Sequence, residues 1–85
     1  MTRIVILSAP QGAGKGRHAR ALARALGCTM IIEDYDGSQK LYPGALALTH
    51  FDPDELNIPH TAEIIRANSE ADIERIVGEI GRAHV

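Results

Sequence analysis

The feature that most constrains this chain is a glycine-rich segment that joins an apolar run to a helical pattern. The run at residues 4–7, Ile-Val-Ile-Leu, is continuous and β-branched, as in a strand buried on both faces of a parallel sheet. After it, Gly12, Gly14 and Gly16 permit backbone conformations that a Cβ would block, so successive N–H groups can turn toward an anion. The N-terminus of the helix that follows favours negative charge at the same place. This order of elements predicts an anion-binding loop made of Gln11, Gly12, Ala13, Gly14, Lys15, Gly16 and Arg17.

The segment resembles the phosphate-binding loop of the P-loop NTPase and kinase superfamily. Pro10 and the run Gly12-Ala13-Gly14-Lys15-Gly16 are similar to the loop of adenylate-kinase-type nucleotide kinases, which also have a glycine after the lysine. The resemblance implies that the chain binds ATP or another nucleoside triphosphate. It also implies that Lys15 contacts the phosphates as a catalytic residue.

The loop departs from the pattern G-x-x-x-x-G-K-[S/T] at two positions. Ala9 replaces the first glycine, which is a mild change if its backbone angles are ordinary. Gly16 follows the lysine, and Arg17 stands where the adenylate-kinase-type loop has a threonine. The missing hydroxyl normally ligates the Mg²⁺ that bridges the β- and γ-phosphates, so the use of Mg²⁺ stays open. We hypothesise that Arg17 replaces Mg²⁺ as the countercharge of the phosphates.

Acidic residues follow a second apolar run at residues 28–32. Carboxylates at the sheet edge where the loop opens can hold Mg²⁺ through water or position a nucleophile. We therefore predict Asp34 as a catalytic residue, and Asp34 and Asp36 as the candidate metal ligands. In kinases that resemble this loop type, acids at this place can contact the phosphoryl acceptor instead, and an Asp-Gly pair such as Asp36-Gly37 is also typical of a simple turn. Thr49 and His50, at the end of a later apolar run, are candidates for sensing a terminal phosphate.

The periodicity of the remaining sequence predicts the other elements. Apolar residues recur at i, i+3, i+4 and i+7 in two stretches, which predicts a helix over 15–26 and another from a capping box at 69–72 to near Gly81. A short helical turn is expected at Pro53, capped by Asp52. The further strands are two buried ones at 28–32 and 45–48 and an edge strand at 62–67. The predicted fold is therefore α/β, a minimal and mostly parallel P-loop sheet in the order β-α-β-β-β-α, with residues 1–85 as a single small domain.

Composition limits the classes of partner. A hydrophobic fraction of 45% with 24% charged residues is typical of a folded globular domain. No apolar run reaches the ~20 residues of a membrane span, so we expect a cytoplasmic protein without a membrane partner. Residues 1–30 contain five basic residues and no acid, and a field of that sign attracts nucleotides. Nucleic acid is a less favoured partner because the net charge is −2 and aromatic residues are few. Cys28, the one cysteine, is expected to be buried rather than reactive.

Three functions remain open at this level. The first is a nucleotide-binding protein with weak or partner-dependent hydrolysis or phosphoryl transfer. In this case a second copy or another protein could complete the site, because the chain offers no obvious arginine finger except Arg17 or Arg66. The second is a noncatalytic interaction module with a relic loop, similar to short P-loop proteins found among bacteriophage accessory genes, such as a host-inhibiting protein. The third is a small kinase for a nucleotide-like acceptor, although the chain has no room for a lid. The remaining histidines, His18, His60 and His84, share no metal-ligand spacing and are assigned no role.

Overall fold

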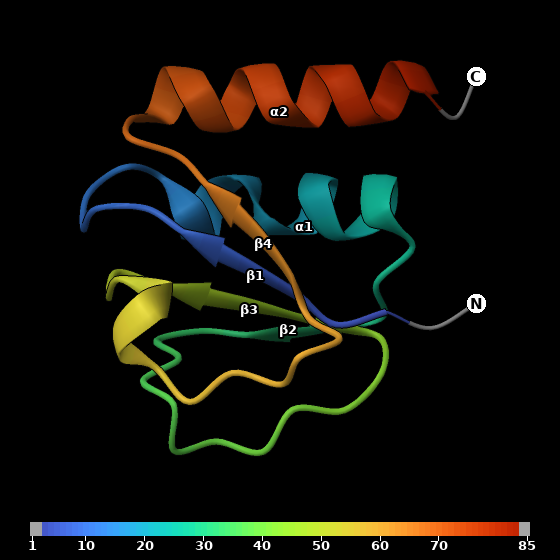
Figure 1. The fold of residues 1–85 in the computed structure, drawn as a ribbon. Coiled ribbons are helices and arrows are strands. Elements are labelled where there is room, and N and C mark those ends of the chain that lie inside the picture. Colours follow the sequence, from blue (N-terminus) through green and yellow to red (C-terminus); the bar gives the residue numbers. More distant parts are fainter. Residues whose placement is uncertain (1–2, 84–85) are drawn as a thin grey trace.

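A parallel four-stranded sheet forms the centre of the computed structural model, which describes residues 3–83 (Figure 1). Along the chain the elements are β1 (Val5–Ser8), α1 (Lys15–Leu26), β2 (Met30–Ile32), β3 (Ala45–Thr49), a 3₁₀ turn η1 (Pro53–Glu55), β4 (Glu63–Arg66) and α2 (Glu70–Ala83). The strands lie side by side in the order β2-β3-β1-β4, and every pairing is parallel. The predicted α/β fold and the order β-α-β-β-β-α are confirmed.

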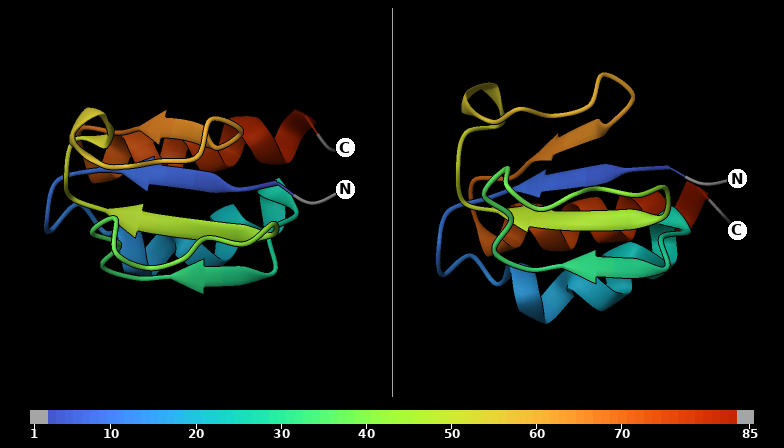
Figure 2. Two further views of the ribbon diagram at one scale, coloured as in Figure 1. Left: turned by 60° about the horizontal axis from the view of Figure 1, so that its bottom comes forward. Right: turned by 90° about the horizontal axis from the view of Figure 1, so that it is seen from below.

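Both helices cover one face of the sheet, and irregular segments cover the other (Figures 1 and 2). The direction of each crossover explains this division. The chain moves from β1 to β2 in one direction across the sheet, whereas the steps from β2 to β3 and from β3 to β4 go in the opposite direction. Because parallel crossovers are right-handed, connections that move in opposite directions pass over opposite faces. Segments 33–44 and 50–62 therefore lie on the face away from α1.

The two faces are packed differently. On the helix face, the inward residues of β1 and β3 meet buried positions of α1 and Ile73 of α2. On the opposite face, a smaller cluster around Ile6, Tyr35 and Ala47 receives Leu41 and Leu56 from the two irregular segments. Tyr35, which lies between the predicted site residues Asp34 and Asp36, is almost fully buried. The segment that carries the predicted catalytic acid is thus fixed to the sheet by an apolar side chain.

The element ends agree with most of the predicted signals. Helix α1 begins after Gly14 and ends before Gly27, both in the left-handed conformation that glycine tolerates. The Asp52 carboxylate accepts a hydrogen bond from the Asp54 N–H at the start of η1, at 3.0 Å. At the start of α2, the Asp72 N–H donates to Ser69 Oγ at 3.3 Å, which is one bond of the predicted capping box. The Asp72 carboxylate accepts from the Asn68 N–H at 2.9 Å, one residue before the position that the box uses. Helix α2 continues past the predicted end near Gly81 to Ala83.

One prediction about β2 was wrong. Residues 28–32 were expected to form a buried strand, but β2 contains only Met30–Ile32 and lies at an edge of the sheet. Met30 and Ile31 are 44% and 38% exposed because only β3 flanks the strand. The preceding Cys28 is buried as predicted, and burial raises the pKa of its thiol. The edge position predicted for β4 is confirmed.

Candidate phosphate-binding site

The carboxyl ends of three strands meet at the place where the glycine-rich loop leaves the sheet. Ser8, the last residue of β1, is in register with Thr49 of β3 and Arg66 of β4. The pairing continues one residue further, because the Ala9 N–H donates to the Thr49 carbonyl at 3.0 Å and the Ala67 N–H donates to the Ser8 carbonyl at 2.9 Å. The chain after β1 turns to α1 on one face, whereas the chain after β3 turns to the other face. Ligands of open α/β sheets bind at such a switch point.

The loop backbone leaves a row of donors free at the start of α1. Gly12 and Gly14 have φ angles of +82° and +83°, which turn the chain sharply before the helix. Within residues 3–83, the N–H groups of Gly14, Lys15, Gly16 and Arg17 have no hydrogen-bond partner, as is usual in the first turn of a helix. Ala9 is buried and does not have a positive φ, so this position does not need a glycine. The geometry suits an anion at the helix N-terminus.

Lys15 lies across the base of this loop. Its Nζ donates to the carbonyl oxygens of Ala9 and Pro10 at 2.7 and 2.9 Å. Burial lowers the pKa of Lys15 below its ordinary value of 10.5, and the Asp34 carboxylate acts in the opposite direction. The ammonium group therefore bridges two neutral carbonyls beside the free N–H groups. An anion in the loop offers it a stronger, charge-assisted partner.

The two acids predicted as metal ligands have different surroundings in the structure. Asp34 has a φ of +54°, the only positive value among the non-glycine residues described, and it lies near enough to Lys15 to influence its charge. Its position is fixed by Tyr35, whose N–H donates to the Leu48 carbonyl at 2.8 Å. Asp36 instead accepts hydrogen bonds from the N–H and Oγ of Ser38, at 2.9 and 2.5 Å, and these bonds lower its pKa. Among residues 3–83, neither acid belongs to a group of three close potential metal ligands, and their metal roles stay predictions.

Glu33 is a residue that the sequence analysis did not single out. Its Oε1 lies 3.4 Å from the position that a Cβ on Gly16 would take. Gly16 is the position at which the standard loop carries its Ser or Thr hydroxyl. A carboxylate oxygen thus lies close to the position that the Ser or Thr side chain of the standard loop would occupy. In the sequence, Glu33 stands out only as an acid next to Asp34. Its approach to Gly16 could not be predicted, because no sequence spacing relates residues 16 and 33.

A second group of charged side chains lies on the other side of the loop, where α1 and α2 begin. Arg17 Nη1 and His18 Nε2 lie 2.9 and 3.0 Å from the same Glu70 oxygen, Oε2. Glu74 Oε1 lies 3.7 Å from His18 Nε2. No role was predicted for His18, whose acidic partners come 52 or more residues later in the chain. The exposed Arg17 therefore has an acidic partner instead of standing free beside the loop.

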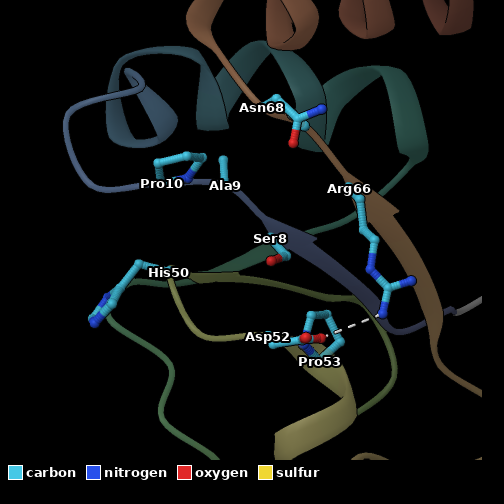
Figure 3. Close-up of a pocket in the computed structure, with 9 residues that line it drawn as sticks. Ser8, Ala9, Pro10, His50, Asp52, Pro53, Arg66 and Asn68 are labelled. Atoms are coloured by element: carbon cyan, nitrogen blue, oxygen red, sulfur yellow. Dashed lines mark ion pairs between the residues drawn. The ribbon is translucent and has the colours of Figure 1, made fainter.

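An open depression of about 360 Å³ borders the loop on its β4 side (Figure 3). Arg66 is its cationic residue and lies 3.6 Å from Asp52 and 3.3 Å from Asp54. His50 lines the depression, whereas Thr49 is fully buried and accepts a hydrogen bond from the Phe51 N–H at 3.1 Å. The lining residues are Ser8, Ala9, Pro10, His50, Asp52, Pro53, Arg66, Ala67 and Asn68.

Comparisons with known proteins identify no relative of this chain. No protein-family model matches the chain, and neither curated proteins nor solved structures give a significant match. Neither helix within residues 3–83 has the length and apolarity needed to cross a membrane. The function must therefore be inferred from the residues at the loop themselves.

Proposed function

We propose that this protein binds the phosphates of a nucleoside triphosphate, with ATP as the expected ligand, and supports weak or partner-dependent hydrolysis or phosphoryl transfer. One observation carries the proposal. Lys15 lies beside a row of free N–H groups that the left-handed Gly12 and Gly14 bring to the start of α1. A positive helix end, free donors and a mobile ammonium group together recognise phosphate oxygens.

Arg17 adds a second cation at the same helix end. Its contact with Glu70 is solvent-exposed, and exposed ion pairs contribute little to stability. Arg17 can therefore leave the Glu70 carboxylate and bind a phosphate oxygen at a small cost in free energy. This supports the hypothesis that Arg17 supplies part of the countercharge that the loop lacks because it has no hydroxyl ligand for Mg²⁺.

The residues around Gly16 also fit a magnesium ion. Mg²⁺ prefers oxygen ligands and keeps several of its waters, so carboxylates near the phosphates can hold it through water. Glu33, beside Gly16, and Asp34, near Lys15, offer these oxygens. When bound, Mg²⁺ would neutralise charge on the β- and γ-phosphates. Asp34 and Glu33 would orient its waters.

A noncatalytic interaction module is the second candidate. The absence of a hydroxyl side chain at positions 16 and 17 favours this candidate. In this case the loop holds an anion or nothing, and no turnover occurs. The two candidates differ in nucleotide binding and in phosphate release.

Calorimetric titration with ATP, ADP and GTP, with and without Mg²⁺, tests the proposal. We expect ATP binding by the wild-type protein and a loss of about tenfold to a hundredfold in Lys15→Ala, because hydrogen bonds to charged groups contribute about 1.5–3 kcal/mol. Lys40→Ala is the matched control, since this exposed lysine lies over the Tyr42 ring in the β2–β3 connection. Absence of binding, or equal affinity in the two lysine variants, would contradict the proposal. Phosphate release measured on the same samples then separates turnover from binding alone.

A further inference from the structure

We propose that His18, Glu70 and Glu74 form a binding site for a divalent transition metal, with Zn²⁺ as the metal that fits best. The site lies where the first turns of α1 and α2 meet. Its ligands differ from the residues discussed for Mg²⁺ at the loop, and the proposal does not rest on the proposed function. Within residues 3–83, these three side chains are the ones whose potential ligand atoms all lie within 4.8 Å of one another.

The two distances from His18 to the carboxylates are close to those of a tetrahedral site. Zinc binds imidazole nitrogen and carboxylate oxygen at about 2.0–2.2 Å, so the ligand atoms of a tetrahedral ion lie about 3.3–3.6 Å apart. His18 Nε2 is 3.0 Å from Glu70 Oε2 and 3.7 Å from Glu74 Oε1. These separations bracket the required value. Small side-chain adjustments would therefore make room for the ion.

The backbone already places the ligands on facing surfaces. Glu70 and Glu74 are separated by four residues on α2, so they lie one above the other on one helix face. His18 belongs to the first turn of α1, which packs against α2 through the core on the helix face. His18 is only 20% exposed, whereas Glu74 is 61% exposed. The site thus has one well-held nitrogen ligand and an open side through which a metal and a water ligand can enter.

The donor set determines the class of metal. One imidazole nitrogen with two carboxylates suits zinc and related transition metals, whereas Mg²⁺ and Ca²⁺ prefer oxygen ligands alone. Arg17 also donates a hydrogen bond to Glu70 Oε2 at 2.9 Å. Carboxylates that ligate metals are commonly held by such outer partners. Without metal, Arg17 and His18 contact Glu70 directly and link the two helices.

Zinc titration of the intact protein, monitored by calorimetry without nucleotide, tests the site, and Co²⁺ reports ligand geometry by its visible absorption. We expect 1:1 binding of Zn²⁺ and no comparable binding of Mg²⁺. Glu74→Gln and His18→Gln should weaken zinc binding by at least about tenfold, the lower range of loss when even an outer partner of a metal ligand is altered. Glu79→Gln, five residues further along α2, and His60→Gln are the matched controls and should bind as wild type does.

Circular dichroism verifies that each variant is folded, and the exposed Glu74 makes its variant the decisive one if His18→Gln unfolds. Absence of zinc binding by the wild-type protein would overturn the proposal and leave only an ion-pair cluster. Binding that persists in Glu74→Gln, or that falls equally in Glu79→Gln, would also overturn it, because the metal would then have other ligands.

Discussion

Gly14 is the residue at which the loop, α1 and α2 come closest together. It precedes the helix in the left-handed conformation, and a Cβ at this position would lie 2.8 Å from Glu70 Oε2. An L side chain in this conformation costs about 1–2 kcal/mol, and Glu70 would also have to move. Glycine is therefore required here both by backbone conformation and by the approach of the second helix.

Replacing Gly14 by alanine should lower the free energy of unfolding by about 1–2 kcal/mol, for this reason. Gly81→Ala is the matched control because Gly81 lies within α2 and a Cβ there meets no atom within 4 Å. That change should instead stabilise the protein by about 0.5–1 kcal/mol, because alanine favours helix. Urea unfolding of both variants measures the effect. Equal responses at the two positions would contradict the left-handed geometry of Gly14.

Glu33 is expected to act on Mg²⁺ rather than on the phosphates directly. Glu33→Gln should weaken ATP binding by about fivefold, or roughly 1 kcal/mol, when Mg²⁺ is present, because one hydrogen-bonded carboxylate is lost from the waters of the ion. It should leave binding without Mg²⁺ unchanged or slightly stronger. Calorimetry of Glu33→Gln beside the exposed Glu55→Gln makes the comparison. An equal loss with and without Mg²⁺ would assign Glu33 a structural role instead.

Residues of the loop were predictable from sequence because they are contiguous and their types have a direct conformational meaning. The partners of the loop were not. Glu33 approaches Gly16, and Glu70 approaches Gly14, only because the sheet order brings the ends of distant elements together. The same holds for His18, whose acidic neighbours belong to α2. Such contacts leave no periodicity or spacing in the sequence.

At the scale of elements, Ile73 is the residue of α2 that is fully buried among the described residues, and α2 packs chiefly against α1. This side chain is fully buried in the core on the helix face, next to positions of α1. Ile73→Ala should therefore lower the free energy of unfolding by about 2–5 kcal/mol, as large-to-small core changes do. Ile64→Ala provides the comparison, since Ile64 is an exposed residue of the edge strand β4 and its change should cost less than about 1 kcal/mol. Similar losses in urea unfolding would mean that α2 does not pack as described.

The type of each element was predicted more successfully than its position in the sheet and its burial. Helix α1 has the predicted ends, because both its apolar spacing and its glycine terminus are local signals. The run ending in β2 contains residues that suit a central or an edge strand equally well, and only the strand order decides which it becomes. Tyr35 was missed as a core residue for a related reason, since its burial depends on segments 33–44 and 50–62 meeting on the same face.

At the scale of the whole molecule, the sheet has one face covered by helices and one covered by irregular segments. Tyr35 is the largest buried side chain of the second face. Burial raises the pKa of the Tyr35 phenol above its ordinary value of 10.0, and the Asp36 carboxylate raises it further. As the pH rises past 10.0, the unfolded chain loses this proton first, so the folded state becomes relatively less stable.

The wild-type protein should accordingly lose stability as the pH rises through this range. Tyr35→Phe, which retains the ring and removes the ionisable group, should show a smaller loss, measured by urea unfolding at pH 8 to 11. Tyr42→Phe serves as control because Tyr42 is exposed, and it should follow the wild type. If the pH dependence of stability were the same in the wild type and in Tyr35→Phe, the Tyr35 phenol would not be buried on the second face as described.

The measurement that tests the phosphate-binding function most directly is a ¹H–¹⁵N NMR titration of the protein with ATP. We predict that the amide signals of Gly14 to Arg17 shift most, because their free N–H groups would donate to the phosphates. At the same ATP concentration, Lys15→Ala should show much smaller shifts, while Lys40→Ala should retain them. The first experiment needs no Mg²⁺, and a second with Mg²⁺ should extend the shifts to Glu33 and Asp34. Shifts that avoid the loop, or that Lys15→Ala leaves unchanged at the same ATP concentration, would contradict a phosphate-binding role for this segment.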